Sequence, residues 1–86
     1  MLQFPNPSRS YDATRHAVRF WGHEGAMEAC FFICSESLAR LQPGIQPSEA
    51  DLLRAFDANR DRIQEIALKV YGRGRRGSYD LVVGDF

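Results

Sequence analysis

One amphipathic segment, residues 49–71, constrains the fold of this 86-residue chain more than any other feature. Its apolar residues recur at steps of three and four, which places them on one stripe of an α-helix. The stripe consists mainly of Leu52, Phe56, Ile63, Ile66 and Val70. Ser48 supplies an N-cap that Asp51 can complete as a capping box, and Gly72 supplies a stop. We therefore predict one long helix that must bury its stripe against a second layer.

Strand patterns on either side of this segment predict that second layer. Residues 17–21 alternate between apolar and polar side chains, and an apolar run over 27–34 follows the turn residues 22–25. These two strands predict an antiparallel hairpin, while residues 35–41 predict a short helix and residues 79–83 a last strand. The expected fold is α+β of order β-β-α-α-β. Its sheet is small, three-stranded and antiparallel, with the long and the short helix packed on one face.

Length and charge place further limits on the protein. We expect a single domain over 1–86, with an irregular lead-in over 1–16 and a Gly/Arg linker over 72–77. Eleven basic and eleven acidic side chains cancel, which removes the general attraction to nucleic acid or anionic lipid. The N-terminus lacks a signal-peptide pattern, and no run approaches the roughly 20 apolar residues of a membrane span. We expect a cytoplasmic protein with reduced thiols.

The two cysteines, Cys30 and Cys34, raise the questions of a disulfide and of a metal site. On a strand they share one face about 13 Å apart, too far for a disulfide. On a helix they would be adjacent, and an apolar run alone does not separate the two assignments. The C-x-x-C spacing of zinc sites is missing, so His16 and His23 are not ligands by motif. We interpret the cysteines as small buried apolar residues and predict no metal and no cofactor.

Motifs of enzyme chemistry are missing from the sequence: it contains no G-x-S-x-G, H-E-x-x-H or P-loop pattern. Residues 72–77 match G-x-G-x-x-G, but they follow a helix and precede a strand, the reverse of a dinucleotide site. Several polar residues could meet near the hairpin end: Asp12, His16, His23, Glu24 and Glu28. Turn formation and solubility explain them, so we predict no catalytic residues. A hydrolase-like or ligand-binding site around His23 and Glu28 is a distant alternative.

The face of the sheet turned away from the helices is the first candidate interaction surface. It would carry Arg19, Trp21, Glu28, Cys30, Phe32 and Val82. Such a face is too apolar to be left in water. We rank a homodimer first, coverage by residues 42–47 second and an aromatic platform for RNA bases third.

The linker is the second candidate surface, and its charges lie between two tyrosines. It holds Arg73, Arg75 and Arg76, between Tyr71 and Tyr79. Cations beside aromatic rings suit phosphates and stacked bases, so weak binding of RNA or single-stranded DNA is the alternative function. Trp21 or Phe32 would take part. A solvated connector is the preferred interpretation, because the overall charge is balanced and cations suit a helix C-terminus.

Four blocks of sequence are distinctive when taken together. They are Phe20-Trp21-Gly22-His23, Phe31-Phe32-Ile33, the stretch from Leu53 to Arg60, and Gly77-Ser78-Tyr79. These blocks resemble the bacterial family called domain of unknown function 1488, over nearly the whole chain. The resemblance implies a compact α+β fold and no activity, ligand or catalytic residue. We therefore expect an uncharacterised small bacterial protein, non-catalytic, that serves in interactions and self-associates through its sheet.

Overall fold

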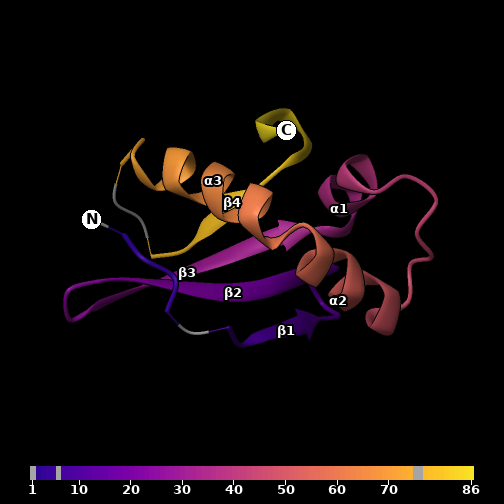
Figure 1. The fold of residues 1–86 in the computed structure, drawn as a ribbon, viewed down its shortest axis with the longest axis horizontal. Coiled ribbons are helices and arrows are strands. Elements are labelled where there is room, and N and C mark those ends of the chain that lie inside the picture. The colour runs from indigo at the N-terminus through magenta and orange to yellow at the C-terminus, as the bar shows by residue number, and fades with distance from the viewer. Residues whose placement is uncertain (1, 6, 75–76) are drawn as a thin grey trace.

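The computed structural model describes residues 2–5, 7–74 and 77–86. In chain order the elements are β1 (Arg9–Asp12), β2 (Ala17–Glu24), β3 (Met27–Cys34), α1 (Ser35–Leu41), α2 (Glu49–Ala58), α3 (Arg60–Tyr71), β4 (Tyr79–Leu81) and the 3₁₀ turn η1 (Val83–Asp85). Figure 1 shows α2 and α3 lying across the sheet, with α1 beside the end of β3. The α+β class is confirmed. The described part of the chain holds four strands and three α-helices, where three strands and two helices were expected.

The sheet is mixed, which corrects the prediction of a wholly antiparallel one. Its strand order is β1-β2-β3-β4. The first three strands form an antiparallel meander, and β4 pairs parallel to β3, with Phe31 opposite Tyr79 and Ile33 opposite Leu81. All three helices lie between β3 and β4 in the chain. Such a crossover returns the chain to the end where β3 begins, so the next strand runs parallel.

Strand β1 lies in the stretch 1–16 that we expected to be irregular. It pairs antiparallel with the first half of β2 and forms one edge of the sheet. The turn after it is closed by Asp12, whose Oδ1 accepts hydrogen bonds from the backbone amides of Thr14 and Arg15. All four residues of β1 are half-buried, so the strand has no alternation of apolar and polar residues to reveal it.

The predicted long helix is divided at Asn59, which corrects its expected continuity. Asn59 has φ −116° and ψ 20°, outside helical values, and separates α2 from α3. Its Nδ2 donates to the carbonyl of Ala55 at 2.8 Å and to Oε1 of Gln42 at 3.2 Å. Asparagine side chains compete with the backbone for such carbonyls. The amide is therefore satisfied at a bend, and it fastens the chain after α1 to α2.

The hydrophobic core fills the space between the sheet and the helices. Phe31 is fully buried near its centre and stacks on Phe20 and Tyr79, each with 5.2 Å between ring centroids. The helices contribute buried members of the predicted stripe: Leu52, Phe56, Ile63 and Ile66. Because strand side chains alternate between faces, the residues next to Phe20 and Phe31 on their strands point to the other side of the sheet. In the described part of the chain, no helix is long and apolar enough to span a membrane.

The N-terminal residues close the core over the hairpin. Backbone hydrogen bonds join Gln3 to His23 in both directions, at 2.8 and 2.7 Å, and Leu2 is buried. Gly22 makes this approach possible. A Cβ built there would lie 3.0 Å from Phe4 Cε1, 3.1 Å from Leu2 Cδ1 and 3.3 Å from the carbonyl oxygen of Gln3.

Replacing Gly22 should therefore displace the N-terminal segment. We expect Gly22→Ala to lower the free energy of unfolding by about 1–3 kcal/mol through overpacking, measured by urea denaturation. Gly84→Ala is the matched control, because a Cβ at Gly84 meets nothing within 4 Å. Equal stability of the two variants would contradict the close approach.

A three-membered ion pair joins β1 to the bend between α2 and α3. Asp57 accepts from Arg9 at 3.0 and 2.8 Å and from Arg60 at 2.7 Å. The hydrogen bond from Arg9 has the largest effect on the pKa of Asp57 and lowers it. Burial raises this pKa by less, and the hydrogen bond from Arg60 lowers it again, so the pKa lies below its ordinary value. The carboxylate is 41% exposed, so water screens these attractions.

The lowered pKa of Asp57 predicts an acid-dependent contribution to stability. We expect Asp57→Asn to lower the free energy of unfolding by about 1 kcal/mol near pH 7. The wild-type contribution is complete above the unfolded pKa of about 3.9. It is lost as pH falls through the lower folded value, so the two proteins should converge below about pH 4. Chemical denaturation across pH measures this, and a difference that grows on acidification would contradict it.

Candidate functional site

The side of the sheet opposite α2 and α3 brings together the residues that the sequence marked for interaction. We call it the outer face and define it by Arg15, Arg19, Trp21, Cys30, Phe32 and Asp80. Register explains its membership: Phe31 and Ile33 are buried in the core, and Phe32 between them points the other way. Across the hairpin, Arg19 lies opposite Phe32 and Trp21 opposite Cys30.

Arginine side chains lie over both aromatic rings of the outer face. The Arg15 Cζ is 4.1 Å from the centroid of Phe32, and the Arg19 Cζ is 5.1 Å from that of Trp21. This is the geometry of a cation–π contact. Phe32 is only 7% exposed, and Trp21 is half-buried. Less apolar surface is therefore exposed on this face than the sequence suggested. The groups that remain accessible are the edges of guanidinium groups beside aromatic rings.

Charges of both signs share this face. Phe32 lies opposite Arg19 on one side and opposite Asp80 of β4 on the other. Asp80 has a long ion pair with Arg15, 3.7 Å between Nη1 and Oδ1, and is 63% exposed. Beyond this row, His23 and Glu28 are 3.8 Å apart at the hairpin end. Among the described residues, no carboxylate lies within 4.0 Å of the Arg19 guanidinium.

Both cysteines lie on this side of β3, which confirms the strand assignment. They are free thiols and are half-buried, where full burial was expected. Burial raises the pKa of the Cys30 thiol, more than nearby Arg19 lowers it, so this thiol is protonated at neutral pH. Cys34 Sγ lies 3.0 Å from the hydroxyl oxygen of buried Ser37, which donates to the carbonyl of Leu81 at 3.2 Å. Cys34 thus helps to fasten α1 to β4, in keeping with a structural role.

A hollow of about 320 Å³ opens at the β4 side of the outer face. Its walls include Arg15, Phe32, Cys34, Asp80 and Val82. Val82 is 50% exposed, one of the large hydrophobic residues left accessible on the molecule. The hollow therefore combines apolar surface with an ion pair at its rim.

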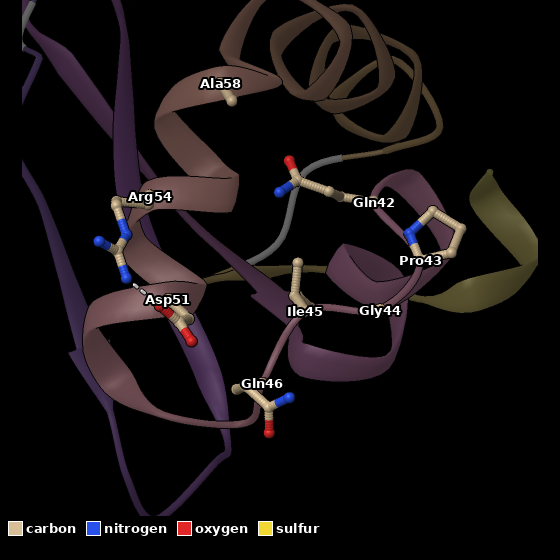
Figure 2. Close-up of a pocket in the computed structure, with 8 residues that line it drawn as sticks. All are labelled: Gln42, Pro43, Gly44, Ile45, Gln46, Asp51, Arg54 and Ala58. Atoms are coloured by element: carbon tan, nitrogen blue, oxygen red, sulfur yellow. Dashed lines mark hydrogen bonds and ion pairs between the residues drawn. The ribbon is translucent and has the colours of Figure 1, made fainter.

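A second hollow, of about 560 Å³, lies between α2 and the chain after α1. Figure 2 shows Gln42, Ile45 and Gln46 on one wall and Asp51, Arg54 and Ala58 of α2 on the other. Arg54 pairs with Asp51. Ile45 packs against the core, so residues 42–47 lie beside α2. The expectation that these residues cover the outer face is therefore wrong. Amides and a paired aspartate form no catalytic set.

The arginine linker divides into a described and an undescribed part. Arg73 donates to Asp85 at 2.8 Å, and Asp85, with its side chain 8% exposed, also accepts from the amide of Val82 at 3.0 Å. Arg73 therefore ties the end of α3 to η1. Arg75 and Arg76 lie outside the described residues. The flanking tyrosines pack together with 5.3 Å between ring centroids, and Tyr79 is buried.

Two members of the outer face, Arg15 and Asp80, were not predicted from the sequence. Arg15 was placed in the irregular lead-in, where its Asx turn gives no hint of contact with Phe32. Asp80 was assigned to the last strand, but only the parallel pairing of β4 with β3 places it beside Phe32. Of the predicted site residues, Arg19, Trp21 and Phe32 meet on one face, whereas Arg73 belongs to a different ion pair.

The polar residues near the hairpin have separate, local contacts. Asp12 closes the turn before β2, and the His23–Glu28 pair is long at 3.8 Å. Within residues 2–5, 7–74 and 77–86, no three His, Cys, Asp or Glu side chains gather as a metal ion would require. The outer face therefore remains the candidate site, because it combines arginine side chains, aromatic rings and an exposed carboxylate.

Comparison with known proteins gives the family and a fold neighbour. Residues 2–83 match the family described as protein of unknown function (DUF1488), so the chain belongs to this family, as its sequence blocks suggested. Its fold is similar to the crystal structure of a protein of unknown function from the DUF1488 family of Shewanella loihica PV-4. The TM-score is 0.82 and the identity 19%, over 93% of this chain and 90% of that chain. A search of curated proteins gives no significant match.

Proposed function

We propose that this member of the DUF1488 family is a non-catalytic interaction protein that self-associates through its outer face. The observation that carries the proposal is the pair of arginines lying over Phe32 and Trp21, on the side of the sheet opposite α2 and α3. Tryptophan and arginine are enriched at the energetic centres of protein interfaces. A guanidinium over a ring is weakly hydrated and keeps its N–H edge for a partner's acceptor.

The mixed charge of this face favours a protein partner over a polyanion. Arg15 and Arg19 are accompanied by Asp80 and by Glu28, so no single sign dominates. Binding of nucleic acid draws its affinity from several cations that neutralise phosphates. Arg73, one of the cations expected to do so, is already paired with Asp85. The alternative of a weak RNA or single-stranded DNA binder therefore has less support.

Two exposed hydrophobic residues allow a matched test of the proposal. Val82 borders the outer face and is 50% exposed, whereas Leu68 is on α3 and is 39% exposed. Sedimentation velocity over a concentration series would measure self-association of the wild type, Val82→Asp and Leu68→Asp. We expect Val82→Asp to weaken association about tenfold or more, because it brings an unpaired charge into the contact. Leu68→Asp should associate like the wild type.

The opposite ranking of the two variants would move the interface to the helices and reject the proposal. Nucleic acid is tested in parallel by fluorescence anisotropy with short RNA and single-stranded DNA at two salt concentrations. No saturable binding at micromolar protein is expected. Salt-sensitive binding that is lost in the Arg73→Glu/Arg75→Glu/Arg76→Glu variant would favour the alternative.

A further inference from the structure

One row of residues crosses the outer face with opposite charges at its ends. Arg19 of β2, Phe32 of β3 and Asp80 of β4 are cross-strand neighbours in register. Adjacent strands are about 4.8 Å apart, so the backbones of Arg19 and Asp80 lie about 10 Å apart, on either side of Phe32. The Arg15 guanidinium lies over this ring, so the row presents two cations and one anion. Set against its own reverse, each end of the row still meets the opposite charge.

A closed dimer places the same surface against itself about a two-fold axis. For two sheets packed face to face with their strands aligned, the axis lies between them, either across the strands or along them. An axis across the strands through this row sets Arg19 over Arg19 and Asp80 over Asp80, which like-charge repulsion disfavours. An axis along β3 exchanges the ends of the row, so that each cation meets an anion.

Resting on the proposed function, we infer that the partner of the outer face is a second copy of this chain. The copies dock face to face about a two-fold axis along β3, and Arg19 of each pairs with Asp80 of the other.

Arg19 and Asp80 both have hydrogen-bonding groups available for a contact with a second copy. Among the described residues Arg19 has no carboxylate within 4.0 Å, and its guanidinium presents several N–H donors. Asp80 is 63% exposed and its ion pair with Arg15 is long, so acceptor positions remain on its two oxygens. In the dimer Asp80 is shared between Arg15 of its own chain and Arg19 of the other.

The size of the face predicts a weak dimer. Strands β2 and β3 have eight residues each, and the four strands span about 15 Å. Two such faces bury several hundred Å², below the roughly 1,200 Å² at the lower end of stable interfaces. Association should therefore appear at high protein concentration and exchange rapidly.

Charge reversal tests the pairing through a mixing experiment. Arg19→Asp and Asp80→Arg should each raise the dissociation constant of the dimer at least about tenfold, because both contacts then join like charges. An equimolar mixture should restore it to within about threefold of the wild type, since in the mixed dimer both contacts join opposite charges. Sedimentation equilibrium measures all three samples, and circular dichroism checks that each variant is folded. Arg62→Asp on α3, 51% exposed, is the control and should associate normally.

Crosslinking tests the axis independently of charge. An axis along β3 keeps each residue of β3 at its own level, so Cys30 faces Cys30 and Cys34 faces Cys34 across sheets about 10 Å apart. A bismaleimide of about that reach should join Cys34→Ser chains through Cys30, and an equimolar mixture of Cys30→Ser and Cys34→Ser chains should give few mixed crosslinks. Predominantly mixed crosslinks would indicate the axis across the strands.

Failure of the charge-reversal mixture to dimerise, with Val82→Asp still blocking wild-type association, would overturn this symmetry and leave the outer face as the interface. Association that neither Val82→Asp nor either charge reversal alters would overturn both. A wild type that stays monomeric at millimolar concentration would also overturn both, because the proposed function is itself self-association.

Discussion

Phe31→Ala should remove about 4 kcal/mol from the free energy of unfolding, the largest effect expected for a single change in this protein. The ring is fully buried and contacts four others, with centroid distances of 5.2 Å to Phe20 and Tyr79, 5.8 Å to Phe4 and 6.5 Å to Tyr71. Its removal leaves a cavity at the junction of the sheet, α3 and the N-terminal segment. Domains have about 5–15 kcal/mol of stability in total, so much of the margin would be lost.

Urea denaturation followed by circular dichroism measures the loss. Phe31→Leu is the matched variant, which keeps most of the apolar volume and should cost about half as much or less. A change below about 1 kcal/mol in Phe31→Ala would contradict the central position of this ring.

Phe32→Ala, one residue further along β3, should cost less, about 2 kcal/mol. Phe32 is 7% exposed, but on its outer side it is covered by the Arg15 guanidinium instead of by core residues. Truncation removes buried apolar area and one cation–π contact, while Arg15 can return to water. The same denaturation experiment gives the value.

The comparison of the two phenylalanines tests the assignment of faces. A cost for Phe32→Ala equal to that of Phe31→Ala would mean that the outer face is packed like the core. Arg15→Ala supplies the complementary variant, because it uncovers the ring without removing it. We expect it to cost less than 1 kcal/mol, the usual value of an exposed cation–π contact.

The sequence predicted those parts of the fold that follow from local patterns. The stripe from Leu52 to Val70 gave the helices and their buried side, and alternation gave the hairpin of β2 and β3. The bend at Asn59 was not predictable, because a single asparagine on a helical stripe fits both a continuous helix and a break. Beside its local bond to Ala55, Asn59 donates to Gln42, and a contact so distant in sequence leaves no pattern to read.

The outer face was predictable only in part, for a similar reason. Alternation along β2 and β3 placed Arg19, Trp21 and Phe32 together without knowledge of the remaining strands. Asp80 joins them through the parallel pairing of β4, which depends on how three helices return the chain to the sheet. Arg15 reaches Phe32 from a turn whose conformation is set by Asp12. Neither contact leaves a periodic signal in the sequence.

Quenching of tryptophan fluorescence is the most direct measurement of the central claim, that the outer face is the contact surface. Trp21 is the single tryptophan of the chain and lies on this face, so its emission reports on the surface without a label. Acrylamide quenching would be measured over a protein concentration series, alongside sedimentation of the same samples. As the mean mass rises, we predict that the quenching constant of Trp21 falls and its emission shifts to shorter wavelength. A rise in mass with unchanged quenching would place the contact elsewhere and contradict the account.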